Sequence, residues 1–525
     1  MAQSTSAMGS VTGTVLDPQS RPIADAKIVL RNTDFTSTRS FTTDEAGRFI
    51  ATFLPVGPYA LQVTAAGFDL KKPVRLNVGA GSSTVVEVRL SVKSSSQSVT
   101  VTGTGATVEG NTVNTSVNRT ESLASNQVAG LTVTYLPSRN RDFTQMTQLA
   151  AGTEADPDSN GIVIAGQRPE SLKLAIDGAD FDDPLRGGVR GAEDGALFFP
   201  QVVVREVQIV RSGATAEVGG TNAGFVNVAT KSGANKVRGE AFYIARPAAF
   251  GSRDPFGHSL ENRQHLLGGS IGGPIKKDRA FFYIGLEQDF LRVPYWTQFA
   301  EQAPGVPVSA ALASQQLQIV SESNPTALFG RTDFNLGAAH TLNLQLNYNH
   351  VTASNLADGF VRTLSTIDNR DDLSGQSVWG RASLTSVLST ATVNHILAAW
   401  QTDHRAMDTN STAPEIFING FGVLGGNAFS PHRFTSNNFQ LSDDLSFTRG
   451  NSSWSVGGLV GYAPVRVTQV GYLNSRFDFS SLSEFVAGNF RRYRQSFVIG
   501  DPTFDESVKS IGAYVSVKQP ITDRL

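Results

Sequence analysis

The chain has 525 residues, enough for two or three domains rather than one. Its 44 basic and 46 acidic residues leave a net charge of −2, so the broad positive field that attracts nucleic acid is absent. It has no cysteine, which excludes a disulfide framework, a thiolate metal site and a cysteine nucleophile. It also has no run of about 20 apolar residues, which excludes membrane-spanning helices.

The first region, residues 9–92 after a tail of residues 1–8, alternates short β-rich runs with turn signals. Ala26, Ile28 and Leu30 share one face, which is the period of a half-buried strand. Several such runs within about 80 residues predict a small antiparallel β-sandwich. The motifs G-x-V-x-D, T-D-x-x-G-x-F and L-P-x-G-x-Y resemble the carboxypeptidase regulatory-like, transthyretin-like domain. That resemblance implies an accessory module without peptidase activity, and no zinc-binding His/Glu pattern is present.

A serine-rich stretch, Ser94–Ser98, follows, and residues 93–110 are predicted to be a linker. The linker contains the run SVTVTG, Ser98–Gly103. This run resembles the TonB box of TonB-dependent outer-membrane receptors, a segment that pairs as an added strand with the energy-transducing partner. An ordinary strand after a linker has the same letters, because high β-propensity gives both. The candidate TonB-box residues are Ser98, Val99, Thr100, Val101 and Thr102.

Residues 111–235 are predicted to form a mixed α/β domain. Its end contains two apolar strands, Val202–Val210 and Phe225–Ala229, separated by a glycine-rich turn. Together they resemble the end of the plug domain of TonB-dependent receptors, with the pattern V-x-R/S-G…A-x-x-G…G-G-x-V-N-V-x-T-K. In such receptors a β-barrel wall surrounds the plug, and the length of the chain after residue 236 predicts only part of that wall. We therefore expect these two strands to be more exposed than in an intact receptor.

A second plug-like run, Ile164–Asp180, resembles the family pattern I-R-G-x-R…D-G. It departs from that pattern at Ala165, where the family has arginine, so no role of that arginine is carried over. Four acidic residues between 177 and 183 are interpreted as a solvated loop rather than a metal site. The residues matched to the plug motifs are Gly166, Arg168, Asp177, Gly178, Arg211, Gly213, Glu217, Gly219, Gly224, Asn227 and Lys231.

The last region, residues 236–525, contains alternating strands separated by long polar connections. In HTLNLQLNYNH (His340–His350), leucines occupy one face and amides the other. A soluble sandwich would bury the leucines, whereas a membrane β-barrel would turn them toward lipid and the amides toward a wet lumen. The pattern alone favours neither. The run His265–Arg292, with G-G-x-x-G-G-P-I-x-K-D-x-x-F-F, resembles the first barrel hairpin of Oar-like TonB-dependent receptors.

The resemblance implies a fold that is mainly β: a sandwich, a plug, then part of a large antiparallel transmembrane barrel. Transporter barrels of this kind have about 22 strands, which at roughly 20–25 residues each need on the order of 450–550 residues. Roughly 290 residues follow Lys236. We therefore expect an incomplete barrel, and a receptor truncated at its C-terminus.

Three short motifs also fit known sites by chance. Gly268–Gly272 fits the nucleophile motif G-x-S-x-G, but Gly273-Pro274 follows where a helix is required. Gly420–Gly426 fits a dinucleotide motif without a surrounding βαβ unit. The triad Asp156, Asp158 and Asn160 is a weak calcium candidate, because Gln167 stands where a bidentate glutamate belongs. We expect no enzymatic activity and no cofactor.

Two functions are compatible with these features. The first is a receptor in the cell outer membrane that imports an extracellular ligand, with its plug and N-terminal domain on the periplasmic side. Its implied partners are the TonB complex, outer-membrane lipid and a glycan, peptide or siderophore ligand, with no nucleic acid. The alternative is a non-transporting Oar-like surface protein for adhesion or assisted secretion. A soluble multi-sandwich binding protein is a third possibility, and it requires Leu342, Leu344 and Leu346 to be buried in a closed core.

Overall fold

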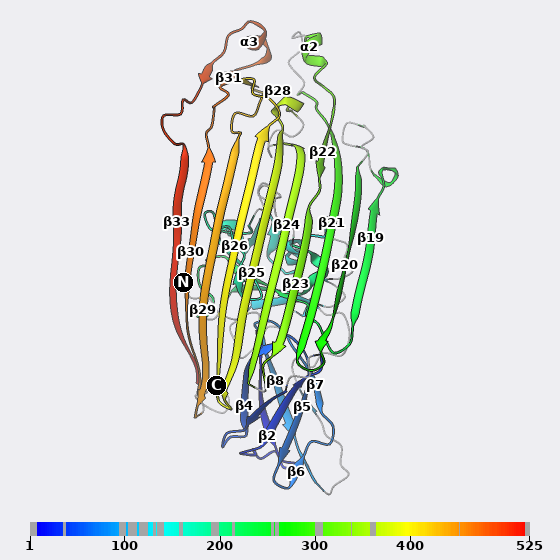
Figure 1. Cartoon of the computed structure of the whole chain (residues 1–525), viewed down its shortest axis with the longest axis vertical. Coiled ribbons are helices and arrows are strands. Elements are labelled where there is room, and N and C mark those ends of the chain that lie inside the picture. The colour runs from blue at the N-terminus through cyan, green and yellow to red at the C-terminus, as the bar shows by residue number, and fades with distance from the viewer. Residues whose placement is uncertain are drawn as a thin grey trace.

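The computed structural model has three parts that follow one another along the chain (Figure 1). They are an N-terminal domain at one end of the molecule, a central domain, and a large sheet of long strands. The structure describes residues 8–34, 38–93, 101–102, 113–114, 124–129, 133, 141–156, 161–190, 199–212, 216–251, 253, 257, 262–299, 308–337, 339–357, 364–450 and 452–519.

The N-terminal domain is a sandwich of two sheets, with strand orders β10-β8-β1-β4 and β3-β2-β5-β6-β9, where β7 pairs with β5. Its core is apolar, and Ile28, Leu30 and Leu61 are fully buried between the sheets. The prediction of a sandwich is confirmed, although β1 and β8 pair in parallel rather than antiparallel. The strands are β1 (Met8–Leu16), β2 (Lys27–Asn32), β3 (Thr38–Thr42), β4 (Arg48–Pro55), β5 (Gly57–Ala65), β6 (Phe68–Asp69), β7 (Val74–Val78), β8 (Ser83–Arg89), β9 (Ser91–Val92) and β10 (Val101–Thr102).

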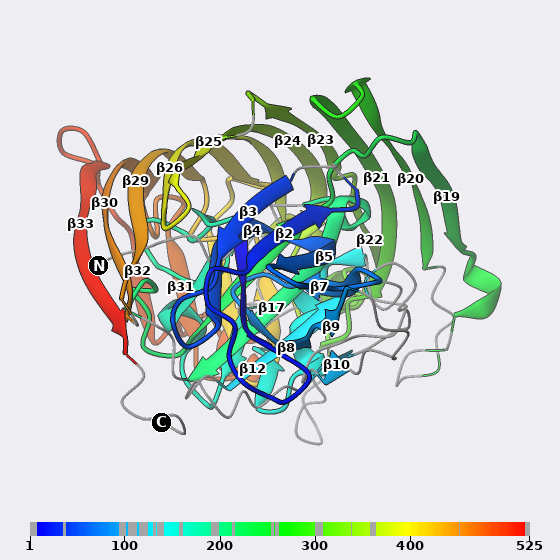
Figure 2. The same cartoon turned by 90° about the horizontal axis from the view of Figure 1, so that it is seen from below.

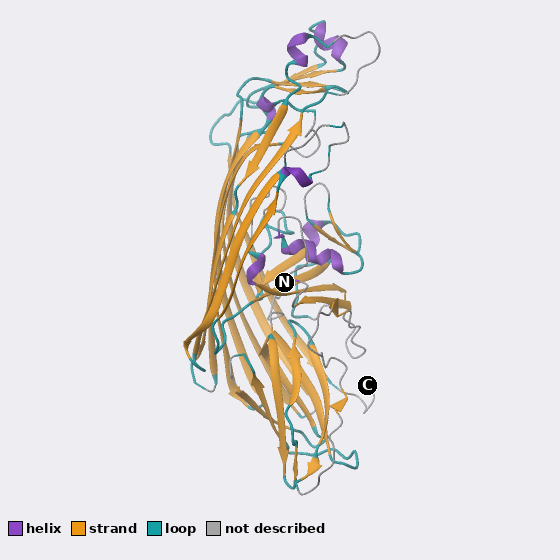
Figure 3. Cartoon of the chain, turned by 90° about the vertical axis from the view of Figure 1, so that its right-hand side faces the viewer, coloured by secondary structure: helices purple, strands orange, loops and turns teal. Residues whose placement is uncertain are grey.

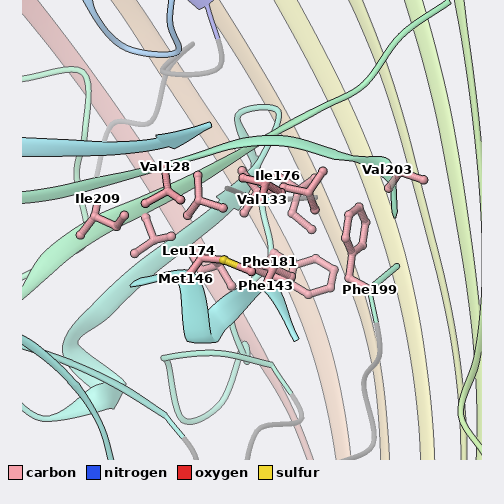
Figure 4. Close-up of a cluster of buried hydrophobic side chains, with 14 of the residues drawn as sticks. Val128, Val133, Phe143, Met146, Leu174, Ile176, Phe181, Phe199, Val203 and Ile209 are labelled. Atoms are coloured by element: carbon pink, nitrogen blue, oxygen red, sulfur yellow. The ribbon is translucent and has the colours of Figure 1, made fainter. Parts of the chain in front are cut away.

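The central domain, which comprises the described residues from 113 to 230, is built on a six-stranded sheet of order β11-β12-β17-β18-β15-β16. A hairpin, β13-β14, and three short 3-10 helices pack beside it. Figure 4 shows its apolar core, in which Met146, Leu174 and Ile209 are fully buried. The elements are β11 (Val113–Asn114), β12 (Ala124–Ala129), η2 (Phe143–Leu149), β13 (Thr153–Ala155), β14 (Ile162–Ile164), η3 (Pro169–Ser171), β15 (Leu172–Ile176), β16 (Ala179–Asp180), η4 (Gln201–Val203), β17 (Val204–Ser212) and β18 (Gly224–Thr230).

The two strands at the end of this domain are the apolar pair found in the sequence. They pair antiparallel, with Val207 opposite Val228. Almost every residue of β18, and the middle of β17, is buried. Most of both strands is therefore buried in this chain, and their greater exposure relative to an intact receptor stays a prediction.

The large sheet has 11 strands, and β19 and β33 are its two edges within the described part of the chain. β22 and β23 occupy one strand position, since both pair with β21 and β24, and two residues separate them. The other connections alternate between short turns of two to four residues and longer ones of 14 to 33 residues. Figure 2 shows the strands in an arc, with the central and N-terminal domains on the concave side. The strands are β19 (Arg238–Arg246), β20 (Arg263–Lys276), β21 (Ala280–Trp296), β22 (Gln318–Ser323), β23 (Thr326–Asn335), β24 (His340–Leu356), β25 (Asp371–Ser389), β26 (Thr392–Thr409), β29 (His432–Arg449), β30 (Ser452–Gln469) and β33 (Thr503–Lys518).

The two faces of this sheet differ in chemistry. On β24, Leu344 and Leu346 are 40% and 54% exposed on the convex face, whereas Asn347 and Asn349 are 0% and 2% exposed on the concave face. Exposed apolar side chains continue this convex surface on the other strands, for example Leu441 and Val460. The soluble-sandwich interpretation is therefore wrong, because the leucines that it requires in a closed core lie outside.

The long connections form a separate layer at the end of the sheet far from the N-terminal domain (Figure 3). It contains a small sheet of order β28-β27-β31-β32, packed on Phe421, Phe479 and Leu482. None of the described helices has the length and hydropathy needed to cross a membrane. The elements are η5 (Ala248–Phe250), α2 (Ala310–Ala313), η7 (Ile367–Asn369), β27 (Glu415–Ile418), β28 (Gly422–Leu424), β31 (Arg476–Phe479), α3 (Leu482–Val486) and β32 (Arg492–Arg494).

Candidate functional site: the contact between the central domain and the large sheet

The central domain touches the concave face of the sheet through one apolar patch and several polar bridges. In the patch, Phe199 of the central domain meets Phe329 of β23 edge to face, with ring centroids 5.8 Å apart. Trp379 of β25 lies in the same cluster and is 1% exposed. Figure 4 places Phe199 at the side of the cluster that faces the long strands. The concave face is therefore apolar at this patch and polar around it.

The first polar bridge centres on Asp177, in the turn between β15 and β16. Asp177 has a φ of 48° and Gly178 a φ of 83°, so both residues of the turn adopt the left-handed backbone conformation, which Asp and Gly accommodate. Its carboxylate accepts the Thr230 amide at 3.0 Å and the Gln345 Nε2 of β24 at 2.7 Å. Arg331 of β23 lies 3.6 Å away. This carboxylate thus joins the end of β18 to two strands of the large sheet.

The strand register extends this bridge across the sheet. Arg331 on β23 lies opposite Gln345 on β24, which in turn lies opposite Arg381 on β25. Two residues further along each strand, the next pair of side chains on the concave face is Asp333 opposite Asn343. Arg331 pairs with Asp333 at 2.9 Å, Asn343 donates to Asp333 at 2.7 Å, and Arg381 donates to Asn343 at 2.6 Å. The result is a continuous polar network over three strands.

A second bridge centres on Glu287 of β21, which is completely buried. Its carboxylate accepts the Val202 amide at 2.8 Å and the Nε of Arg141 at 3.2 Å. Both donors belong to the central domain. A carboxylate with charge-assisted donors tolerates burial that an unpaired one does not.

A third bridge involves the acidic cluster at residues 177–183, which is not the solvated loop that the sequence suggested. Asp177 and Asp183 are 6% and 8% exposed. Lys173 pairs with Asp180 at 2.9 Å and with Asp182 at 2.6 Å, while Arg405 of β26 pairs with Asp183 at 3.2 Å. Burial raises the pKa of Asp182 to about 6, although Lys173 opposes this shift. The acids face basic partners supplied by other strands, which no local pattern reveals.

The remaining plug-motif residues mostly shape the central domain itself. Gly166 adopts a φ of 72° after Ala165, and Arg168 occupies the N-cap position of η3 without a side-chain capping hydrogen bond. Arg211 donates to the Ala151 carbonyl at 3.0 Å, and Lys231 pairs with Glu240 of β19 at 2.8 Å. Gly224 begins β18, Asn227 is buried within it, Glu217 and Gly219 lie in the loop before it, and Gly213 lies outside the described residues.

The other sequence candidates have simple positions. Val101 and Thr102 form β10, which pairs antiparallel with β8, while Ser98, Val99 and Thr100 lie outside the described residues. Asp158 and Asn160 also lie outside them, and the described residues contain no cluster of three or more metal-binding side chains. Gly268–Gly272 runs within β20, and Gly420–Gly426 includes β28 and the residues on either side of it.

The sequence placed Gln345 on the amide face of its strand without identifying its partner, and it gave no indication of Glu287, Arg331 and Arg405 as contacts of the central domain. Each is a polar residue at an inward position of a strand. The signal was present in part, because alternation marks the inward positions. The sequence does not show the register of the strands, which decides which inward residues contact the central domain.

Comparison with known families places the chain. The outer membrane beta barrel domain matches residues 229–300 and 297–520, which is more than half of the chain. The chain belongs to this family. It is an outer-membrane protein, and the convex apolar face of the large sheet is the face such a protein turns to lipid. The carboxypeptidase regulatory-like domain matches residues 10–91.

Individual relatives agree with this assignment. The TonB-dependent transporter Oar of Myxococcus xanthus is 26% identical over 293 residues, which are 54% of this chain and 27% of Oar. The outer membrane transporter YddB of Escherichia coli has a similar fold, with a TM-score of 0.53, 12% identity, and coverage of 75% of this chain and 54% of YddB. The FpvAI–pyocin S2 complex gives a TM-score of 0.51 at 12% identity, covering 84% of this chain and 57% of that one.

These alignments have two consequences. The chain spans about a quarter of the curated relative and little more than half of the two solved chains. The structural likeness, at 12% identity, establishes the fold alone. Oar and YddB are named as transporters, which fits the expectation that the chain is not an enzyme.

Proposed function

We propose that the chain forms part of a TonB-dependent outer-membrane receptor, which binds an extracellular ligand and imports it with energy from the TonB complex. The central domain acts as the plug, and the concave face of the large sheet as the wall that encloses it. The N-terminal domain then lies on the periplasmic side, because barrels of this kind have short turns there and long loops outside. A glycan, a peptide and a siderophore are all compatible as ligand.

One observation carries the proposal: beside one apolar patch, the central domain is held on the wall by several separate polar bridges. Asp177, Glu287 and Asp183 each accept from a few donors, and most of these contacts cross between the central domain and the sheet. Net contributions of such bonds are about 1–3 kcal/mol each. A force applied to the plug can therefore break them one at a time, while the wall keeps its strand-to-strand hydrogen bonds.

The segment on which TonB would pull is the proposed TonB box, Ser98 to Thr102. Its last two residues form β10 at the edge of the N-terminal sheet, so the partner would replace β8 as the neighbour of this strand. These 525 residues contain no cysteine, so an introduced cysteine is unique among them. We expect Val101→Cys in the full-length receptor to form a disulfide with a cysteine placed on TonB in cells.

The matched control is Lys277→Cys, in the exposed turn between β20 and β21 at the same end of the sheet. It should form no such disulfide. Equal cross-linking of both positions would contradict TonB-box pairing at Val101. If deletion of residues 98–102 left ligand uptake unchanged, the non-transporting surface function would replace the transport proposal.

A further inference from the structure

The convex face of the large sheet has an apolar band with an aromatic side chain at each edge. On β30, Trp454 lies near the short-turn end, and Tyr462 lies eight residues further along the same face. Aromatic residues gather at the two edges of the apolar band of a membrane barrel. The positions between these two rings, such as Val456 and Val460, therefore lie in the hydrocarbon layer of the membrane.

One carboxyl group interrupts this apolar band. Asp443 of β29 is exposed, two residues after the exposed Leu441, so alternation places both on the convex face. Asp443 lies opposite Gly458, which is midway along β30 between Trp454 and Tyr462. A carboxyl group at this depth is costly, and such groups usually mark a contact with another polar group.

The carboxyl group of Asp443 has one hydrogen-bond partner among the described residues. Asn394 of β26 donates its Nδ2 to Asp443 Oδ1 at 2.5 Å, and the same Nδ2 lies 3.4 Å from the carbonyl oxygen of Asp444. The cross-strand neighbours of Asp443 are Ile396 on β26 and Gly458 on β30, and neither has a side-chain donor. Because lipid tails also have no donor, the second carboxyl oxygen is left to a partner from outside the chain.

The surface beside Asp443 allows another protein surface to approach closely. Gly458 and Ala513 continue its row across β30 and β33, which lie next to β29 in Figure 1. The neighbouring row contains the larger and exposed Leu441 and Val460. The row of Asp443 is therefore a shallow depression, and small residues of this kind permit close packing inside a membrane.

We propose that this surface of β29, β30 and β33 is an interface between two copies of the chain in the outer membrane. A two-fold axis brings the same patch of both copies together. The two Asp443 carboxyl groups then lie against each other and share a proton, so each gains a hydrogen-bond partner that lipid cannot supply. A second copy suits the patch because a carboxyl group that shares a proton is complementary to itself. The interface lies on the lipid-facing surface, so it goes beyond the proposed function and does not depend on transport.

The first test is cross-linking of the full-length protein in outer membranes. Ile396→Cys places a thiol directly beside Asp443, and a short bismaleimide should join two copies into a covalent dimer. Ile284→Cys is the matched control, since Ile284 of β21 is 45% exposed on the same convex face and several strands away from β29. The control should give little dimer.

The second test removes the carboxyl group. Asp443→Leu should fold, because leucine suits a lipid-facing position. Its dimer should dissociate about tenfold more readily, measured by dilution of fluorescently labelled protein in lipid vesicles. Asp505→Leu removes an exposed acid of β33 at the long-connection end of the sheet and should leave the dissociation constant unchanged.

Each contrary outcome overturns the proposal. Equal cross-linking at positions 396 and 284 would mean that the copies meet by random collision. Cross-links at position 396 to other proteins, without a dimer, would mean that the partner is not a second copy. An unchanged dissociation constant in Asp443→Leu would mean that the two carboxyl groups do not meet.

Discussion

The N-terminal domain and the large sheet are built from the same alternation of apolar and polar residues, used in opposite directions. In the N-terminal domain, Leu61 of β5 is fully buried and its neighbours along the strand face outward. On β24 of the large sheet, Leu346 is 54% exposed and Asn347 is completely buried. The comparison teaches that period-two alternation specifies a strand with two different faces. Which face is turned to solvent, to lipid or to another domain is set by the surroundings.

The interiors of the two regions are stabilised differently as a result. The N-terminal core is a single apolar cluster, with leucines, valines and aromatic rings from both of its sheets. The concave side of the large sheet combines one apolar patch with amides, acids and arginines that reach the central domain. The first interior is stabilised mainly by apolar burial, whereas the second combines apolar burial with polar contacts.

The largest expected difference in stability is between the same leucine-to-alanine substitution made in each of the two regions. Leu61→Ala should destabilise the N-terminal domain by about 2–5 kcal/mol, because it removes buried methyl groups and leaves a cavity. Leu346→Ala should change stability in detergent by less than about 0.5 kcal/mol, as exposed positions do. Amide hydrogen exchange of β5 and β24 measures both. Equal effects of the two substitutions would mean that the faces of β24 are assigned wrongly.

A second substitution tests whether the convex face of β24 contacts lipid. Leu346→Arg should cost about 2–4 kcal/mol for folding into lipid vesicles, since a charged group on the lipid face of a barrel is desolvated near the midplane. Thr64→Arg, at an exposed position of β5 in the N-terminal domain, is the control and should have little effect. Urea titration of folding in vesicles gives the free energies. A tolerated arginine at position 346 would contradict a lipid-facing surface there.

These two predictions rest on what the sequence already indicated. Alternation along His340–His350 identified the strand and the grouping of leucines and amides on opposite faces, and the glycine-rich runs identified the paired strands of the central domain. Neither pattern could establish that Asp177 meets Gln345, because these residues are 168 positions apart. Such a contact depends on the register of β23, β24 and β25 and on how the central domain is seated against them. Likewise, the parallel pairing of β1 with β8 follows from chain crossover rather than from local composition.

A third prediction addresses the polar side of the comparison. Asp177→Asn should loosen the central domain on the wall by about 1–3 kcal/mol, because a buried charge-assisted acceptor is lost while Arg331 keeps Asp333. The amide of Thr230, which donates to Asp177, should exchange faster. Asp505→Asn breaks an exposed pair with Arg466 and should leave the exchange of the Thr230 amide unchanged. If Thr230 were protected equally in both variants, Asp177 would not hold the domain in place.

The smallest effect concerns the contact of the N-terminal domain with the central domain. Glu206 of β17 accepts the Ala80 amide at 2.6 Å, and burial raises the pKa of this carboxyl, opposed by Ala80 and Arg205. A pKa that is raised in the docked state favours the protonated form. The docked state is therefore most stabilised below the ordinary carboxyl pKa of about 4.3, and that contribution is lost as pH rises through the raised value.

Glu206→Gln keeps the acceptor for Ala80 and cannot titrate. Its thermal unfolding midpoint should fall less steeply than that of the wild type between about pH 4 and pH 7. The other carboxyl groups are the same in both proteins, so their contributions cancel in the difference between the two slopes. Identical slopes would show that Glu206 titrates normally and that its burial has no energetic consequence.

The central claim is that the large sheet turns its leucines to lipid and its amides toward the central domain. Nitroxide labels on single cysteines at positions 344 to 347 of the full-length protein, in outer membranes, test it directly. We predict that positions 344 and 346 collide with dissolved oxygen, which concentrates in lipid. Positions 345 and 347 should be shielded from both oxygen and a water-soluble relaxation agent. Strong contact of positions 344 and 346 with the water-soluble agent, or the same accessibility at all four positions, would contradict the account.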